Sequence, residues 1–145
     1  TYPFPNSLVI KKIDGKTLKQ YLEKDAEYWD VQDEKIIVEK SRDFPTPQAH
    51  NYDMLDGIEY TIKVSNPIGK RIISLTRNNK EIKDDDEFTL CINNYRASGG
   101  GDYDMLKNAE NLKEIQKSVV EIIAEYIEKK KVIDFKPVNN IKVIL

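Results

Sequence analysis

The sequence has little of what hydrolytic centres and disulfides are built from: its 145 residues include one cysteine and one histidine. Cys91 has no partner for an internal disulfide, and its place in an alternating segment predicts a small core residue. His50 alone cannot supply the several His and Asp ligands that two adjacent metal ions require. No serine lies in a Gly-x-Ser-x-Gly context, and His50 would be its only base. We therefore expect no catalytic residue, no metal ligand and no cofactor in this chain.

Long apolar runs and a strong excess of one charge are also missing. No apolar stretch reaches 18 residues, and the chain opens on Tyr2-Pro3-Phe4-Pro5, so we expect neither a membrane segment nor a signal peptide in it. A net charge of -2 disfavours binding to a nucleic acid polymer, which would call for a basic face. With 39% hydrophobic and 33% charged residues, the composition predicts one soluble domain with a sizeable core.

The periodicity of the apolar residues predicts the fold class. It indicates an α+β single domain, in which two main helices pack on a mixed, mostly antiparallel sheet. Apolar residues at helical spacing predict helices at 16–29, with Tyr21 and Trp29 in the core, and at 112–127. Strands are expected at 7–13, 35–39, 58–64, 71–76, 81–82, 87–93 and 141–145, with a tight turn at Asn78-Asn79 between the fourth and fifth.

An aromatic residue and three glycines follow the predicted strand 87–93. The run Asn93-Asn94-Tyr95-Arg96-Ala97-Ser98-Gly99-Gly100-Gly101-Asp102-Tyr103 places a flat ring beside a loop that can approach a ligand closely and present its N–H groups. A flexible connection between a strand and a helix is the alternative. We expect the Tyr95 ring at the rim of the sheet and Tyr103 packed inside, where it would anchor the loop.

Two further runs accompany this one: Tyr2-Pro3-Phe4-Pro5-Asn6 at the start, and Asn51-Tyr52-Asp53 followed by Asp56-Gly57-Ile58-Glu59-Tyr60. In this order, the three runs resemble the C-terminal domain of the secreted 5'-nucleotidase family. That family includes the 2',3'-cyclic-nucleotide 2'-phosphodiesterase/3'-nucleotidases. This branch is the closer likeness, because all three runs, including Asn-Asn-Tyr-Arg-Ala at 93–97, resemble its pattern. The resemblance extends from about residue 2 to 127.

The resemblance implies a binding role for particular residues. In the family, the C-terminal domain holds the nucleoside and sandwiches the base between two aromatic rings, which correspond by position to Phe4 and Tyr95. Asn6 would hydrogen-bond the base or the ribose, and Asn94, Gly99 and Gly100 would lie beside the ligand. Many members bind the ribose hydroxyls with an aspartate at the position of Gly101. Here Asp102, one residue later, or backbone groups would make that contact.

The resemblance also implies the setting of residues 1–145. They would be the nucleotide-binding part of a larger two-domain enzyme, whose N-terminal metallophosphoesterase domain holds two divalent metal ions and performs the hydrolysis. That domain and a nucleoside or nucleotide are the expected partners, and the location would be extracytoplasmic: secreted, periplasmic or in the cell wall. Alone, the chain would be inactive. The alternative is a structural or protein-interaction domain whose aromatic residues are ordinary core.

Overall fold

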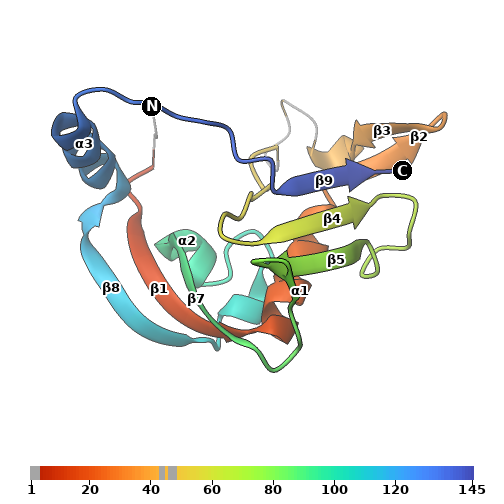
Figure 1. Ribbon diagram of the computed structural model, residues 1–145, viewed down its shortest axis with the longest axis horizontal. Coiled ribbons are helices and arrows are strands. Elements are labelled where there is room, and N and C mark those ends of the chain that lie inside the picture. The colour runs from red at the N-terminus through yellow and green to blue at the C-terminus, as the bar shows by residue number, and fades with distance from the viewer. Residues whose placement is uncertain (1–3, 43–44, 46–48) are drawn as a thin grey trace. The chain divides into compact units, whose positions relative to one another are not determined.

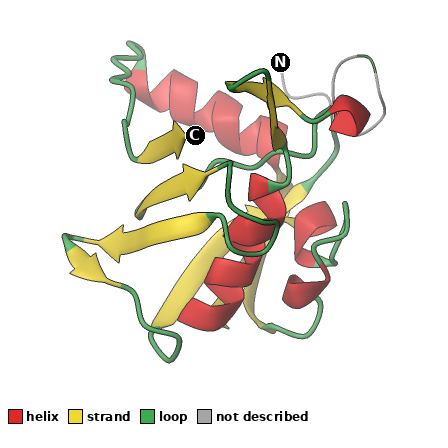
Figure 2. Ribbon diagram, turned by 90° about the vertical axis from the view of Figure 1, so that its right-hand side faces the viewer, coloured by secondary structure: helices red, strands yellow, loops and turns green. Residues whose placement is uncertain are grey.

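The structure is a computed structural model that describes residues 4–42, 45 and 49–145 (Figure 1). Its contacts divide the chain into two compact units, described separately below: unit 1 comprises Thr1–Ile13 and Glu87–Pro137, and unit 2 comprises Asp14–Asp86 and Val138–Leu145. Strands and helices are both present (Figure 2). Among the described strand pairs with a defined register, four are antiparallel and one, β4 (Glu59–Lys63) with β9 (Ile141–Ile144), is parallel, so the predicted mixed, mostly antiparallel α+β class is confirmed. In the described part of the chain, no helix is long and apolar enough to cross a membrane.

Unit 1 is built on a three-stranded sheet with the order β7-β1-β8. These strands are β7 (Glu87–Asn93), β1 (Ser7–Asp14) and β8 (Glu110–Ser118). β8 pairs with β1 in antiparallel orientation. A salt bridge of 2.6 Å joins Lys12 near the end of β1 to Glu87 at the start of β7. The backbone hydrogen bond of 2.8 Å from Gly15 N to Asp86 O also places the end of β1 beside the start of β7. These contacts indicate that the two neighbouring strands run antiparallel, with the start of β1 towards the end of β7.

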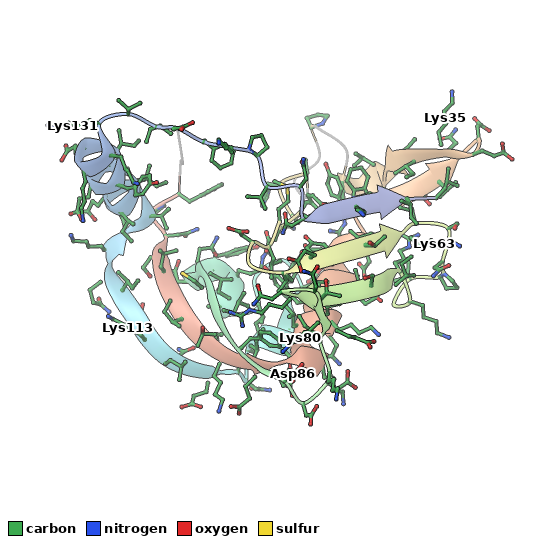
Figure 3. All side chains as sticks on the ribbon, viewed as in Figure 1. Lys35, Lys63, Lys80, Asp86, Lys113 and Lys131 are labelled. Atoms are coloured by element: carbon green, nitrogen blue, oxygen red, sulfur yellow. The ribbon has the colours of Figure 1, made fainter. Side chains whose placement is uncertain are left out.

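The prediction of one helix over 112–127 is wrong in its first half. Residues up to Ser118 belong to β8, and helix α3 covers Val119–Lys130. The pairing of β8 with β1 satisfies backbone groups between residues far apart in sequence, which local periodicity cannot reveal. The start of α3 has a local signal, because Ser118 and Glu121 form a capping box. Lys131, labelled in Figure 3, lies at the C-terminal cap of α3.

A second correction in unit 1 concerns Cys91, which is exposed on β7 rather than part of the core. Along this strand, Glu87, Thr89 and Cys91 are exposed while the residues between them are half-buried. The alternation predicted from the sequence is therefore present, but Cys91 lies on the outer face. Among the described residues, β7 is an edge strand of its sheet, with β1 as its neighbour on one side.

Unit 2 contains a four-stranded sheet with the order β6-β5-β4-β9. The predicted Asn78-Asn79 turn is confirmed: both residues have positive φ and connect β5 (Ile72–Arg77) to the short β6 (Lys80–Glu81). β4 (Glu59–Lys63) pairs antiparallel with β5 and parallel with β9 (Ile141–Ile144). A separate hairpin is formed by β2 (Trp29–Gln32) and β3 (Lys35–Val38).

Helix α1 (Gly15–Ala26) packs against β5 and supplies much of the core of unit 2. Asp14 caps its start by accepting a hydrogen bond of 2.7 Å from the N–H of Thr17. The predicted helix was three residues too long, because Trp29 already begins β2. Of the two aromatic residues expected in the core, Tyr21 is 1% exposed, whereas Trp29 is half-buried.

Short helical segments complete the fold: α2 (Asn94–Ala97) and two 3-10 turns, Lys40–Arg42 and Asp104–Leu106. The predicted loop 41–51 falls partly on residues 43–44 and 46–48, which lie outside the described residues.

Candidate functional site

Tyr95 is placed by the end of strand β7 in unit 1. The strand stops at Asn93, whose side-chain oxygen accepts a hydrogen bond of 2.7 Å from the N–H of Arg96 and so caps α2. Tyr95 lies in this single helical turn with its side chain 47% exposed. An exposed aromatic ring beside a glycine turn is what the sequence predicts here. Asn94, on the same turn, is also exposed.

The glycine turn is closed by its own backbone hydrogen bonds. The N–H of Gly99 donates to Arg96 O at 2.9 Å, and that of Gly100 donates to Tyr95 O at 3.0 Å. Gly99 O in turn accepts from the N–H of Tyr103 at 3.1 Å. The expectation that the Gly99 and Gly100 N–H groups face a ligand therefore needs correction, because the turn uses both internally. They shape the loop instead of forming an anion cradle.

Positive φ occurs at three positions of this turn. Gly99, Gly101 and Asp102 have φ of 87°, 74° and 68°. Glycine adopts this left-handed region without strain, and aspartate tolerates it better than most residues. Gly100 does not adopt it, so its lack of a side chain must serve another purpose. Asp102 is exposed at the end of the turn, next to Tyr103, which is fully buried as predicted.

Phe4 and Asn6 lie just before strand β1 of the same unit. Phe4 is 49% exposed, and Asn6 is half-buried, its backbone oxygen accepting a hydrogen bond of 2.8 Å from the N–H of Val119. Because β1 and β7 are antiparallel neighbours, the residues before β1 and those after β7 lie at the same end of the sheet. Phe4 precedes β1 by three residues and Tyr95 follows β7 by two. The segments that carry the two exposed rings therefore lie at the same end of the sheet.

The acidic residues near His50 have structural partners in unit 2. Asp53 accepts a hydrogen bond of 2.5 Å from the hydroxyl of Tyr21, and Asp56 accepts one of 2.7 Å from the N–H of Gly57. His50 is exposed. Within the described part of the chain, no three His, Cys, Asp or Glu residues gather in a way that could hold a metal ion.

Two buried side chains carry shifted pKa values. Burial of the Lys11 side chain lowers its pKa, although its Nζ donates to Ala109 O at 2.9 Å. Burial of Tyr60 raises the pKa of its phenol well above the usual range. Lys11 lies within β1 and is 3% exposed, and Tyr60 lies within β4 of unit 2 and is 2% exposed. We assign them to the core.

Sequence reasoning did not find the role of two arginines. Arg71 is buried in unit 2, where its guanidinium donates to Ala26 O at 2.9 Å and to Trp29 O at 2.6 Å. Arg96, the residue after Tyr95 in the sequence, is buried in unit 1. A charged residue between an aromatic residue and a glycine run gives no local signal of burial, because its partners come from the folded turn.

Comparison with known proteins gives a consistent result. A family model described as "5'-nucleotidase, C-terminal domain" matches residues 1–108. The trifunctional nucleotide phosphoesterase YfkN of Bacillus subtilis is 30% identical over 154 residues, which cover 96% of this chain and 10% of that protein. A 2',3'-cyclic-nucleotide 2'-phosphodiesterase/3'-nucleotidase of Salmonella typhimurium is 34% identical over 112 residues, covering 68% of this chain and 17% of that protein.

Solved structures agree with these relatives. A Staphylococcus aureus protein assigned as a 5'-nucleotidase, solved in complex with α-ketoglutarate, superposes with a TM-score of 0.92 and 34% identity over 99% of this chain and 28% of that one. The NAD nucleotidase of Haemophilus influenzae shares the fold, with a TM-score of 0.73 and 20% identity over 98% of this chain and 25% of that one. The chain thus spans well under a third of each of these proteins.

Proposed function

Because the chain belongs to the family of 5'-nucleotidase C-terminal domains, we propose that it recognises the nucleoside part of a nucleotide by stacking the base between Phe4 and Tyr95. The observation that carries this proposal is the exposure of both aromatic residues, on segments that lie at the same end of the sheet in unit 1. Each base-aromatic stack contributes about 1 to 3 kcal/mol to binding, and stacking tolerates any base because every base has a π face.

Polar residues around the two rings would orient the sugar. Asn6 and Asn94 flank Phe4 and Tyr95 in the sequence, and an amide side chain can donate and accept at once. Asp102 is exposed at the far end of the glycine turn, and a carboxylate there would accept from two adjacent ribose hydroxyls. We assign the ribose contact to Asp102 in place of Gly101. Gly99 and Gly100 support it by shaping the turn.

Hydrolysis belongs to another part of the polypeptide in this proposal. The relatives are nucleotide phosphoesterases several times longer than this chain. We propose that an N-terminal metallophosphoesterase domain with two divalent metal ions performs the reaction outside the cytoplasm. In such a site the metals activate water and stabilise the phosphoryl transition state. This chain binds the nucleoside in this proposal.

A protein-interaction role is the second candidate, and helix α3 favours it. Four of its apolar side chains are exposed: Val120, Ile123, Tyr126 and Ile127. An exposed apolar helix face is typical of a surface that contacts another protein segment. The two candidates use different parts of unit 1, so they are separable by mutation.

The stacking proposal is tested by titrating adenosine into the 145-residue chain while following by NMR the perturbation of the adenosine base protons, which every variant can report, together with the Tyr95 ring signals where that ring is present. We expect a millimolar dissociation constant, which corresponds to about 4 kcal/mol, because the catalytic domain is absent. Phe4→Ala and Tyr95→Ala should each abolish the perturbation. Ile123→Ala, on the exposed face of α3, is the matched control and should leave it unchanged. Equal adenosine binding by all four proteins would refute stacking and favour the α3 candidate.

The division of labour gives a separate test. The purified chain should bind no stoichiometric Zn²⁺ or Mn²⁺ and should not hydrolyse nucleotides, because one histidine cannot build a two-metal centre. Metal analysis and a phosphate-release assay check this. Metal-dependent turnover that survives repurification and is lost in His50→Ala would contradict it.

A further inference from the structure

Arg96 is almost fully buried between the glycine turn and the core of unit 1, with 5% of its surface exposed. Its guanidinium carbon lies 3.9 Å from the centre of the Tyr103 ring, a close cation-π contact with a residue that is itself 0% exposed. The same guanidinium donates from Nη1 to the backbone oxygen of Gly100 at 2.5 Å. Arg96 therefore ties the middle of the glycine turn to a buried aromatic residue.

Gly100 in turn lies against the Tyr95 ring. A Cβ added at Gly100 would stand 2.6 Å from Cε2, 2.6 Å from Cζ and 2.7 Å from Cδ2 of that ring. Nearly equal distances to three consecutive ring atoms place this position over the ring face, since a position at the ring edge would be much closer to one atom. The lack of a side chain at Gly100 thus provides space for the ring. Its φ is not in the left-handed region, so a conformational need does not explain this glycine.

We propose that Arg96 is a positioning residue for ligand stacking: through Gly100 it holds one face of the Tyr95 ring against the turn and leaves the opposite face for the base. This inference rests on the proposed nucleoside-binding function. Arginine suits the task because its planar guanidinium can stack on Tyr103 and donate in its own plane to Gly100 at the same time. A lysine ammonium is a compact point charge without that combination.

The burial of Arg96 argues against its use as a direct phosphate ligand. One donor is engaged by Gly100 O, and one face of the guanidinium covers Tyr103. Its distance to the centre of the Tyr95 ring, 5.8 Å, is also longer than its distance to that of Tyr103. The effect on a ligand is therefore indirect. A ring that is already fixed loses less freedom when a base stacks on it, which strengthens binding.

The test uses the 145-residue chain and two NMR readouts, one of which needs no ligand. In the unsubstituted chain, the Gly100 Hα that points at the Tyr95 ring face should show an upfield ring-current shift. The Nη protons of Arg96 should give separate signals, because a guanidinium held by Gly100 and Tyr103 rotates slowly. Arg96→Lys should move the Gly100 Hα towards its random-coil position and weaken adenosine binding about threefold to tenfold, the effect of freeing one side chain.

Two further variants separate positioning from folding. Gly100→Ala places a methyl group where the ring stands, so it should displace Tyr95 and weaken adenosine binding while the Arg96 and Tyr103 signals stay in place. Lys107→Ala is the matched control, because Lys107 is the nearest neighbour of a Cβ at Gly99 of the same turn, whereas the nearest neighbours at Gly100 are Tyr95 ring atoms. It should change neither the Gly100 shift nor the affinity.

The outcomes distinguish this inference from the proposed function. A Gly100 shift that is unchanged in Arg96→Lys overturns the positioning role whether or not adenosine binds, and so does a freely rotating Arg96 guanidinium in the unsubstituted chain. If Arg96→Lys fails to fold, the guanidinium rotation and Gly100→Ala still decide. If Arg96→Lys removes the ring-current shift of Gly100 without changing the adenosine affinity, the link between ring position and binding is overturned. If the unsubstituted chain shows the shift but no adenosine binding, the nucleoside-binding function fails and the ring geometry stands.

Discussion

Similar sequence elements are buried in unit 2 and exposed in unit 1. Each contains a tyrosine on or beside a helical segment and one 12-residue helix with an apolar stripe. In unit 2, Tyr21 is 1% exposed, and α1 buries seven of its residues. In unit 1, Tyr95 is 47% exposed, and α3, which is described in full, buries none. Tyr21 and the apolar face of α1 therefore belong to the core of unit 2, whereas Tyr95 and the apolar face of α3 lie at the surface of unit 1.

The partners of each ring explain the difference. The hydroxyl of Tyr21 donates to Asp53, whose N–H in turn donates to Asp25 at 3.1 Å, so the phenol is satisfied inside the unit. A tyrosine can be buried completely when its hydroxyl has such a partner. Tyr95 instead packs one ring face on Gly100 and remains about half exposed. Burial of a ring contributes to stability, and exposure of a ring leaves it available for a ligand.

The largest expected effect separates the two tyrosines by stability. Tyr21→Ala should lower the free energy of unfolding by about 3 to 5 kcal/mol, because it removes a large buried side chain and leaves a cavity. Tyr95→Ala should lower it by only about 1 kcal/mol, because about half of this residue is already exposed in the folded chain. Urea unfolding monitored by circular dichroism measures both values. Similar losses from the two substitutions would show that Tyr95 is also a core residue.

A smaller effect comes from the hydroxyl groups alone. Tyr21→Phe keeps the ring but removes the donor to Asp53, so it should cost about 1 to 3 kcal/mol of stability. Tyr95→Phe should leave both stability and adenosine affinity unchanged, because stacking uses the ring face. The measurements are urea unfolding and the adenosine titration. Loss of adenosine binding in Tyr95→Phe would mean that the hydroxyl, and not the ring, makes the contact.

The smallest effect concerns the carboxylates at the helix starts, where the two units are alike. Hydrogen bonds from Thr17 lower the pKa of Asp14 below its usual 3.8, and hydrogen bonds from Ser118 lower the pKa of Glu121 below its usual 4.5. A lowered pKa in the folded state stabilises the fold above the unfolded pKa, and this contribution is lost as the pH falls through the folded value. We therefore expect stability to fall at acidic pH in both units.

Substitutions that keep the caps but remove the titration isolate this effect. Asp14→Asn retains a good N-cap side chain, and Glu121→Gln retains a capping-box partner, so each should flatten the pH dependence of stability between about pH 5 and pH 2. Urea unfolding across this range is the measurement. The carboxyl carbon shifts of Asp14 and Glu121 report the pKa values directly, and unshifted pKa values would contradict the cap assignment.

Local patterns were sufficient for several parts of this molecule. Strand β7 was predicted with both of its ends, because alternation stops where Asn93 begins the next turn. The Asn78-Asn79 hairpin followed from the tolerance of asparagine for positive φ. Exposure of Tyr95 and burial of Tyr103 followed from their places on either side of the glycines. In each case, the deciding interaction lies within a few residues of the chain.

Other features depended on contacts between distant residues. The apolar spacing of 112–127 was real, but pairing with β1 made its first half a strand. The sequence showed that α1 and α3 each have an apolar face, and only the packing revealed that one is covered and the other exposed. The role of Arg96 likewise required the folded turn, which brings Gly100 O and the Tyr103 ring around one guanidinium.

The amino-acid sequence by itself determined the α+β class, the family and the two candidate rings, because periodicity, turn chemistry and short motifs are properties of neighbouring residues. The tertiary structure decided which apolar faces are buried and that the segments carrying Phe4 and Tyr95 lie at the same end of a sheet. It also decided that Gly100 serves as a surface for a ring. These features depend on which segments meet in space, and long-range packing selects among alternatives that local preferences leave equal.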